Sequence, residues 1–422
     1  MKEYKKTGLK VLFFLCISFL ASCKENTASS ALNIIPLASS VGKYSILNLS
    51  DYVTDIHYIP LETNDSVLIS ERLSYFEHDD YIIYENEKII FDDKISGCMI
   101  FDTNGSFLNM IGSKGQGPNE YLSLHQVFAK DDFVYLYTTP NFLMKYDFNG
   151  KLIGKLKKPE GLSDYYGVGV IHLLRGNLFL ADITTATNLY CPKALLFEAN
   201  DTVSTVIHEF PNSVQLKKDI PFISNFEMAI QYRFKDEIRT YKYINHDTIF
   251  TIGQNLEMKE AFIFDLGKYK HSLALLEMKD RRAKPGIPPL QIKESSNHLF
   301  LTFGFGIYAP EPFEYIRRYG GGLQKTAVNN EVCAVFDKNT GKLTLMNQPI
   351  KGKQGFRNDI DGGPVIWPQY ISTKDELVAL ISAEDMLAHV EQLDNPSPQL
   401  LKVVENIKID DNPIVMIAKM KD

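Results

Sequence analysis

The stretch Cys98–Tyr121, CMIFDTNGSFLNMIGSKGQGPNEY, decides the fold of this chain. In it, Asn104-Gly105 stands between two apolar runs, which is the strongest short-range signal of a β-hairpin. Such a pair is typical of a two-residue type I′ turn, because both central residues of that turn need a positive φ. We therefore expect a strand, a tight turn, a second strand and then a glycine-rich loop.

The hairpin signal recurs along the chain, each time led by an aromatic residue. The five aromatic residues are Phe101, Tyr146, Phe197, Tyr243 and Phe336, at intervals of 45, 51, 46 and 93 residues. A four-stranded propeller blade takes roughly 40–50 residues, so the first three intervals each fit one blade. The fourth holds either a degenerate blade or an insertion, and the helical spacing of leucines in His271–Ala283 favours an insertion. The period predicts an all-β propeller; the alternative is a long β-sandwich with similar hairpins.

Composition and charge limit the classes of partner. The 422 residues include 22 Tyr and 26 Phe, which suit packed β-structure. A formal net charge of −7 with interspersed signs, and no basic stripe, argues against nucleic acid as a partner. The glycines of Gly112–Pro118 lack the Lys-Ser/Thr of a phosphate loop, so we expect a blade connection there and no cofactor.

Residues 1–22 read as a lipoprotein signal peptide. Lysines precede the apolar run Val11–Ala21, which is shorter than the ~20 residues that a membrane-spanning helix needs. The run ends in Leu20-Ala21-Ser22-Cys23, which resembles the lipobox of bacterial lipoproteins and implies acylation of Cys23. The alternative is ordinary cleavage, with Cys23 incidental.

The predicted address is the cell envelope. Acyl chains on Cys23 would anchor the protein in the outer membrane, facing either the periplasm or the cell exterior. Residues 23–45 are rich in Ser, Ala and Asn and are expected to be a flexible tether between the lipid and the propeller. The propeller itself is expected over residues 46–422.

Two terminal strands are expected to close the ring. Ile56–Leu61 reads as a strand near the start of the domain, and Asn412–Lys419 reads as a strand with no partner after it. A propeller ring must close to remove its open edges, so we expect these strands to share one blade. A small helix over Ser382–Leu393 is indicated by a capping-box-like start.

Several stretches together resemble a family of lipid-anchored six-bladed β-propeller proteins common in gut Bacteroidetes. The resemblance implies six blades and covers nearly all of the expected mature chain, but it implies no activity, because the family is largely without assigned function. The hairpin repeat also looks like that of NHL-type propellers, which mostly bind ligands. The stretches that carry the resemblance are Tyr58–Thr63, Phe101–Gly105, Ile111–Tyr121, Asp247–Phe250, Phe264–Tyr269, Asn358–Gly363, Trp367-Pro368 and Asn412-Pro413.

Five residues are candidates for ligand binding. Asn358, Asp359 and Asp361 form part of an oxygen-rich calcium loop, but its bidentate glutamate is missing, so an Asx-turn and a direct ligand contact stay open as alternatives. Trp367 is a candidate stacking platform for a sugar, or a packing residue. Arg317 is a candidate for an anion-binding rim, or part of a solvated charged loop.

No catalytic set is apparent in the sequence. Gly-x-Ser-x-Gly and His-Glu-x-x-His are both absent, and no His or Cys pair has metal-ligand spacing. The leading interpretation is a non-enzymatic binding module for a carbohydrate, a peptide or a partner protein of an outer-membrane system. A hydrolase or lyase acting on polysaccharide at the channel mouth is the alternative, which titratable side chains with perturbed pKa values there would favour. A scaffolding subunit is a further alternative.

Overall fold

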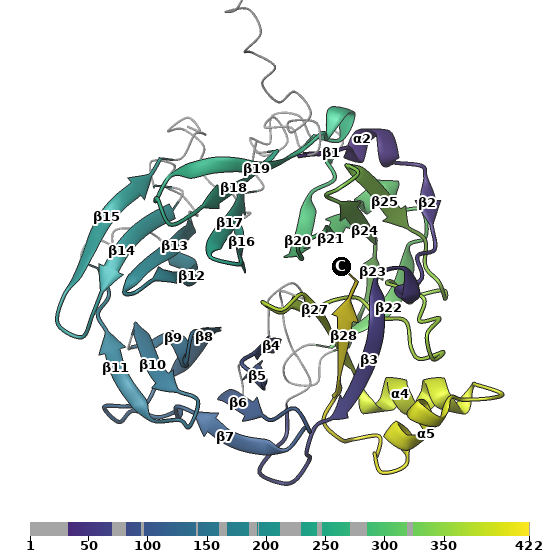
Figure 1. Cartoon of the computed structure of the whole chain (residues 1–422), viewed down its shortest axis with the longest axis horizontal. Coiled ribbons are helices and arrows are strands. Elements are labelled where there is room, and N and C mark those ends of the chain that lie inside the picture. Colours follow the sequence, from purple (N-terminus) through teal and green to yellow (C-terminus); the bar gives the residue numbers. More distant parts are fainter. Residues whose placement is uncertain are drawn as a thin grey trace, which may run out of the picture.

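The computed structural model describes residues 33–69, 82–93, 97–140, 142–159, 167–184, 192, 194–211, 229–242, 247–270, 285–318 and 324–421. Within these residues the strands form six blades around a common axis (Figure 1). Each blade has four antiparallel strands, and the innermost strands of the six blades are β4, β8, β12, β16, β20 and β26. The predicted six-bladed propeller is confirmed.

The blades follow the chain in order. The first holds β4 (Ile82–Glu85), β5 (Lys88–Asp93), β6 (Gly97–Phe101) and β7 (Phe107–Ile111), and the second β8 (Ser123–Lys130), β9 (Phe133–Thr139), β10 (Leu143–Asp147) and β11 (Leu152–Leu156). The third holds β12 (Gly167–Arg175), β13 (Leu178–Thr184), β14 (Ala194–Ala199) and β15 (Ser204–Phe210), and the fourth β16 (Ala229–Phe234), β17 (Glu237–Lys242), β18 (Thr248–Ile252) and β19 (Met258–Phe264). The fifth holds β20 (Pro289–Glu294), β21 (His298–Gly304), β24 (Glu331–Asp337) and β25 (Lys342–Met346).

The sixth blade closes the ring with both ends of the chain. It holds β26 (Tyr370–Ile371), β27 (Glu376–Ile381), β28 (Ile414–Met420) and, outermost, β3 (Val53–Pro60). Strands β28 and β3 pair antiparallel from Ile414↔Pro60 to Met420↔Val53. The predicted sharing of one blade by the two terminal strands is therefore confirmed.

The repeated hairpins are confirmed, but their turn type is not the predicted one. Between β6 and β7, only Gly105 has a positive φ, at 84°, and Asn104 does not. The carboxylate of Asp102 accepts hydrogen bonds from the backbone N–H groups of Asn104 and Ser106, at 2.8 and 2.9 Å. These bonds favour a longer turn with one left-handed glycine over a two-residue type I′ turn. Asp147 and Gly150 repeat the arrangement between β10 and β11.

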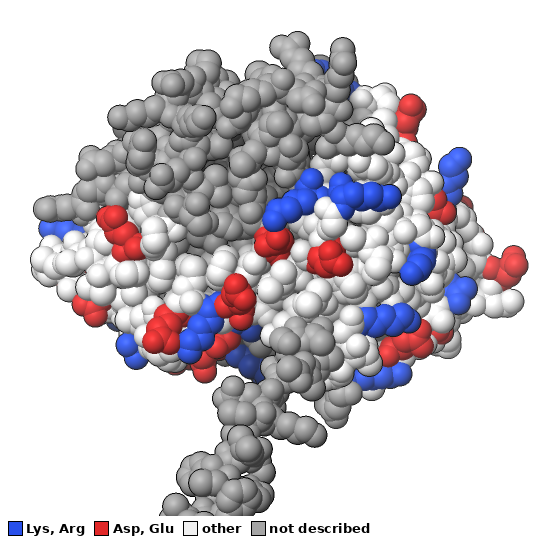
Figure 2. All heavy atoms as spheres, turned by 90° about the horizontal axis from the view of Figure 1, so that it is seen from above, with Lys and Arg blue, Asp and Glu red and all other residues white. Residues whose placement is uncertain are grey.

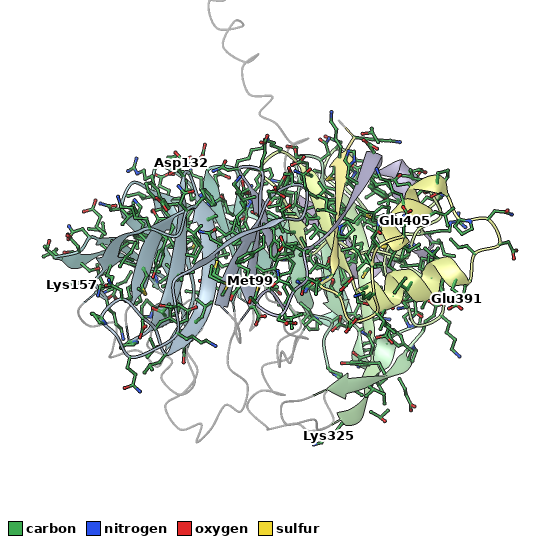
Figure 3. The ribbon with its side chains drawn as sticks, turned by 90° about the horizontal axis from the view of Figure 1, so that it is seen from below. Met99, Asp132, Lys157, Lys325, Glu391 and Glu405 are labelled. Carbon is green, nitrogen blue, oxygen red and sulfur yellow. The ribbon has the colours of Figure 1, made fainter. Side chains whose placement is uncertain are left out.

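The prediction for the fourth hairpin is wrong by one strand. Tyr243 lies outside the described residues, and Thr248 begins β18, so this copy joins the second and third strands of its blade instead of the third and fourth. The long fourth interval contains an insertion, as predicted. Strands β22 (Phe313–Arg318) and β23 (Gln324–Asn329) form a hairpin between β21 and β24 that pairs with no blade and projects from one face (Figure 3). His271–Ala283 lies outside the described residues.

The segment before the first blade strand is folded against the ring. β1 (Ile34–Ile35) pairs in parallel with β19, and β2 (Tyr44–Ser45) pairs in parallel with β25. Between them, α2 (Leu37–Ser40) buries Leu37 completely. The flexible tether expected over residues 23–45 is therefore wrong for residues 33–45, because their apolar side chains and backbone bonds cover the outer edges of two blades. Residues 23–32 lie outside the described residues.

Two helices cover the outside of the closing blade (Figure 1). α4 (Ala383–Glu391) begins after Ser382, whose side chain accepts a hydrogen bond from the backbone N–H of Asp385, so the predicted cap is confirmed. α5 (Pro398–Val404) was not predicted; Ser397 caps it in the same way. Single 3₁₀ turns occur at Leu49–Asp51, Gly267–Tyr269 and Gly306–Tyr308. None of the helices in the described ranges is long and apolar enough to cross a membrane.

Candidate functional site

The predicted loop at residues 358–363 uses its oxygens on the protein itself. Asn358 accepts a hydrogen bond from the N–H of Ile360 (3.2 Å), and Asp361 accepts one from the N–H of Gly363 (2.9 Å), which are two Asx-turns. Both side chains also meet the hydroxyl of Tyr58 on β3, at 3.0 Å from Asn358 and 3.3 Å from Asp361. The other carboxylate oxygen of Asp361 is buried with no hydrogen-bond partner.

Asp359 points away from this group. It accepts hydrogen bonds from the backbone N–H and the hydroxyl of Ser50, at 2.9 and 2.6 Å. Burial acts to raise the pKa of Asp359, but the bonds from Ser50 outweigh it and hold the pKa below its usual value. Among the described residues, no three His, Cys, Asp or Glu side chains are grouped as a metal site would need. The contacts are those of the Asx-turn alternative.

Trp367 is partly buried and packs against the core, and Arg317 lies in a different part of the fold. The indole N–H of Trp367 donates to the hydroxyl of Thr302 (3.1 Å), and its ring stacks on Phe356 at 5.3 Å between centroids. Arg317 is in the projecting hairpin, opposite Lys325, and the structure does not describe its side chain. The five predicted residues therefore do not form one common site.

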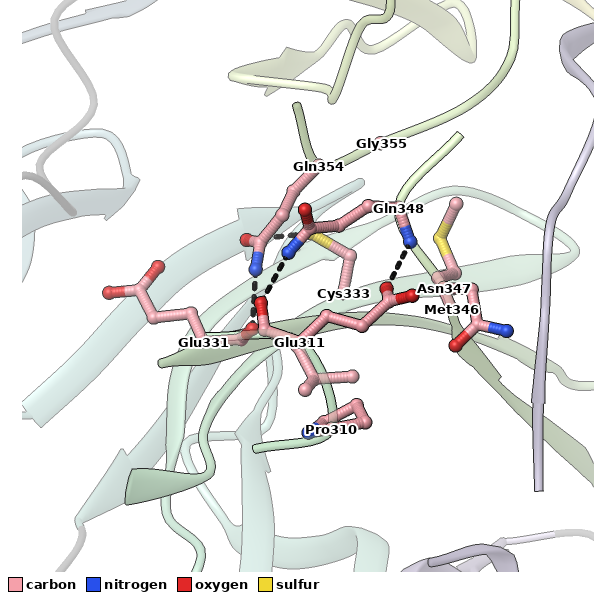
Figure 4. Close-up of a pocket in the computed structure, with 10 residues that line it drawn as sticks. Pro310, Glu311, Glu331, Cys333, Met346, Asn347, Gln348, Gln354 and Gly355 are labelled. Carbon is pink, nitrogen blue, oxygen red and sulfur yellow. Dashed lines mark hydrogen bonds between the residues drawn. The ribbon is translucent and has the colours of Figure 1, made fainter. Parts of the chain in front are cut away.

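A small pocket lies beside the fifth blade (Figure 4). Gln354 donates to the carbonyl of Glu331, and the side chain of Gln348 donates to the carbonyl of Glu311 at 2.6 Å. Cys333 lines the pocket, but burial raises the pKa of its thiol far above the usual range, which makes it unreactive. The free volume is about 10 Å³, enough for a single water. This pocket is too small for a sugar or a peptide side chain.

Polar side chains from four blades converge on the axis of the ring. We call Glu85, Lys130, Arg233 and Tyr370 the axial cluster; they belong to the innermost strands β4, β8, β16 and β26. All four are only partly buried. Glu85, Lys130 and Arg233 lie at or near the strand ends where short turns lead to the second strand of each blade. Asp132, in one of these turns, marks this face of the disc, and Lys325 in the hairpin marks the opposite face (Figure 3).

On one side, the cluster presents a carboxylate held by two hydroxyl groups. The Tyr370 hydroxyl donates to one oxygen of Glu85 (2.7 Å), and the Thr373 hydroxyl donates to the other (2.8 Å). These bonds connect the sixth blade to the first. Burial, followed by the charge of Glu85, raises the pKa of Tyr370 well above its usual value, so its hydroxyl stays protonated and acts as a donor.

On the other side, the cluster presents two cations held by one strand. The amine of Lys130 donates to the carbonyl of Leu174 at 2.8 Å, and the guanidinium of Arg233 donates to the carbonyl of Leu173. The pairing of β12 with β13 shifts between Leu173 and Arg175, which leaves Leu174 as the extra residue of a β-bulge. The bulge places consecutive carbonyl groups within reach of cations from the blades on either side.

The two cations are close enough to affect one another. Burial lowers the pKa of Lys130, and the charge of Arg233 lowers it further. Burial also lowers the pKa of Arg233. Within the described ranges, neither cation forms an ion pair with a carboxylate, and one terminal nitrogen of Arg233 is buried without a hydrogen-bond partner. The axial cluster therefore has unused capacity to donate hydrogen bonds to an anion.

His172 extends the cluster along β12. Its ring nitrogen lies 3.2 Å from the backbone carbonyl of Gln231. Burial first, and then the charge of Arg233, lower the pKa of His172 to about 3, so the ring is neutral at ordinary pH. A neutral imidazole beside a guanidinium adds no further positive charge to the site.

Reasoning from the sequence missed the axial cluster. The signal available was positional: Glu85 and Lys130 each stand directly before a short polar turn, Asn86-Glu87 and Asp131-Asp132, which opens the second strand of a blade. Aligning the blades on this turn, instead of on the Asn-Gly turn, would have marked them as equivalent positions.

Comparisons with known proteins identify a family and one solved structure of the same fold. A family model described as "Domain of unknown function (DUF4934)" matches residues 32–419. A solved structure of a Bacteroides fragilis protein, named as an exported protein, is similar with a TM-score of 0.63 and 16% identity, over 92% of this chain and 100% of that one. The WD40 domain of Neurospora crassa Pan2 is similar with a TM-score of 0.37 and 11% identity, over 81% of this chain and 90% of that one. None of the curated proteins matches.

Proposed function

The chain belongs to the DUF4934 family, and because that family has no assigned function, we propose one from the geometry of this protein. We propose that it is a non-enzymatic binding module of the cell envelope that holds a carbohydrate, a peptide or a partner protein at the axial cluster. The observation that carries this proposal is that the innermost strands of four different blades supply Glu85, Lys130, Arg233 and Tyr370, and that Arg233 interacts electrostatically with the other three. Convergent polar groups on a rigid scaffold are typical of ligand sites.

The envelope address rests on the N-terminal sequence. The signal-peptide pattern ends at Cys23, and the similar Bacteroides fragilis protein is named as exported. We propose that acyl chains on Cys23 anchor the protein in the outer membrane. Replacing Cys23 by Ser should move the protein from the membrane fraction to the soluble fraction and abolish labelling by a fatty-acid probe. Retention of the label by the Cys23→Ser variant would place the lipid elsewhere.

A screen of ligands tests the binding function. The melting temperature of the purified protein is measured with glycans, peptides and divalent ions, and every stabilising compound is then analysed for chemical change. We expect a stabilising ligand that is recovered intact, and loss of the effect when Arg233 is replaced by Gln. A ligand whose effect survives Arg233→Gln and is lost on replacing Asp361 by Asn would move the site to the 358–363 loop.

An enzyme acting on polysaccharide is the second candidate, and the lowered pKa of Lys130 favours it. A lysine whose amine deprotonates more readily can serve as a general base, and Arg233 beside it can stabilise negative charge in a substrate. The same screen separates the two functions, because an enzyme would consume its stabilising ligand. Ligand contacts by Asn358, Asp359, Asp361, Trp367 and Arg317 stay predictions.

A further inference from the structure

We propose that the ligand at the axial cluster is an acidic sugar, a uronic acid or a glycan unit that carries one, with its carboxylate held between Lys130 and Arg233. This inference rests on the proposed binding function and names the chemistry of the ligand. It follows from the two cations on one side of the axial cluster, which have no ion-pair partner among the described residues, and from the hydrogen-bonding groups on the other side.

On the cation side, the described part of the chain supplies no directly bonded anion. Lys130 and Arg233 reach the carbonyl groups of two consecutive residues of β12, so their charged ends lie near one another. Both are partly buried, and the described carboxylates make no ion pair with either. Partly buried like charges that no direct ion pair neutralises repel one another, and a carboxylate between them would relieve that repulsion. One terminal nitrogen of Arg233 is buried without a hydrogen-bond partner, and the planar guanidinium to which it belongs suits a carboxylate.

The acid side offers groups that suit sugar hydroxyls. Each oxygen of Glu85 accepts one bond, from Tyr370 and from Thr373, and a carboxylate oxygen has a second lone pair that can accept from a sugar O–H. A ligand with a carboxylate at one end and hydroxyl groups at the other matches both sides of the cluster.

The surrounding charge favours a single negative charge over a phosphate group. Glu85, Asp131 and Asp236 all lie near enough to raise the pKa of Arg233. They would repel a dianion more strongly than a monoanion. A uronate carries one charge and several hydroxyl groups, whereas inorganic phosphate carries up to two charges at pH 7.

The test compares matched sugars on the purified full chain. Galacturonate and glucuronate are titrated against galactose and glucose, which differ only in the carboxylate, and against inorganic phosphate and acetate. We expect the uronates to bind and the neutral sugars to bind at least about tenfold more weakly, because a charge-assisted hydrogen bond is lost. Arg233→Gln should weaken uronate binding by at least about tenfold, while Lys235→Gln, which removes an exposed cation two residues along the chain, should leave it unchanged.

A second measurement needs no variant, and so it is decisive even if Arg233→Gln fails to fold. The reaction of lysine amines with an acetylating reagent is followed by mass spectrometry, with and without galacturonate. We expect galacturonate to slow the modification of Lys130 and not that of Lys235. Binding without protection of Lys130 would overturn the proposal.

The outcomes separate the ligand class from the binding function. If a neutral sugar or a peptide binds equally well and depends on Glu85, the acidic-sugar inference is wrong and the binding function stands. Equal binding of acetate or phosphate would show a simple anion site and would also overturn the acidic sugar. If none of the probes protects Lys130 and no ligand in the wider screen depends on the cluster, both proposals fail.

Discussion

Replacing Asn412 by Ala should weaken the contact between the start of β28 and the segment that follows β3, and so destabilise the closing blade. Asn412 precedes β28 and is 4% exposed. Its side-chain oxygen accepts a bond from the N–H of Ile69 (2.8 Å), and its amide nitrogen donates to the carbonyls of Glu62 (2.7 Å) and Val67 (2.8 Å). Through these three bonds, one residue at the start of the last strand holds the segment that leaves β3.

The expected loss of stability follows from these contacts. Alanine would leave one N–H and two carbonyl groups without their partner. A hydrogen bond contributes about 1 kcal/mol net, and an unsatisfied buried group costs about 1–3 kcal/mol. We therefore expect a loss of about 3 kcal/mol in the free energy of unfolding, with entering water limiting the cost, and a fall in melting temperature of roughly 3–4 °C for a chain of this size.

Denaturant unfolding and calorimetry measure this loss. Asn255→Ala is the matched control, because Asn255 is exposed and bonds only to nearby Glu257. The control should lose less than about 0.5 kcal/mol. An Asn412→Ala variant as stable as the control would refute the idea that this side chain secures the closing blade.

Three further predictions follow from the fold. Deleting residues 410–422 removes several fully buried side chains that each contribute about 1.5–3 kcal/mol, so we expect the truncated protein to show no cooperative melting transition. A melting transition like that of the wild type would contradict ring closure by this strand. Gly105→Ala should lower the free energy of unfolding by about 2 kcal/mol or more, because the added Cβ would lie 2.1 Å from the carbonyl oxygen of Pro60. Gly176→Ala, which has open space around the added Cβ, should lower it by only about 1 kcal/mol. Equal losses of stability in the two variants, measured by thermal melting, would refute the clash. The pKa of His172 is about 3 in the folded protein and 6.5 in its ordinary state, so the unfolded chain binds the proton first and the free energy of unfolding falls as the pH drops below about 6.5, by about 2 kcal/mol at pH 5. His172→Gln should remove this part of the pH dependence. The same dependence of unfolding free energy on pH in the variant and the wild type would contradict it.

The fold was predictable because its determinants are local and repeated. Each turn such as Asp102–Ser106 specifies a hairpin by itself, and the period of the turns specifies a blade. Closure was predicted from the need of a propeller ring to remove its open strand edges, which led us to place Ile56–Leu61 and Asn412–Lys419 in one blade. The turn type was not predictable from Asn104-Gly105 alone, because the carboxylate of Asp102 competes for the same backbone N–H groups.

Two parts of the fold left too weak a pattern in the sequence. β1 and β2 are two residues long and pair in parallel with outer strands, and two residues show no periodicity that could separate them from a flexible tether. The fourth hairpin was assigned to the wrong pair of strands, because Asp247-Thr248 resembles the repeat but lies between the second and third strands of its blade. Local turn chemistry reports that a hairpin exists, but not which strands of the blade it connects.

The sequence also indicated how charge is distributed over the surface. On the face shown in Figure 2, Lys and Arg side chains are interspersed with Asp and Glu, as the sequence indicated.

The candidate site was hidden because its parts are far apart in the sequence and only ring closure brings them together. Asn358 and Asp361 attracted attention as neighbours, yet neighbours in a loop mostly satisfy one another and the adjacent backbone. Glu85 and Tyr370 are 285 residues apart, and their hydrogen bond crosses from the first blade to the blade that both chain ends build. A ligand held by this pair would therefore bind only to the closed ring. It should stabilise the ring against opening at the joint between β3 and β28, so the Asn412→Ala variant should gain at least as much in melting temperature from a saturating ligand as the wild type does.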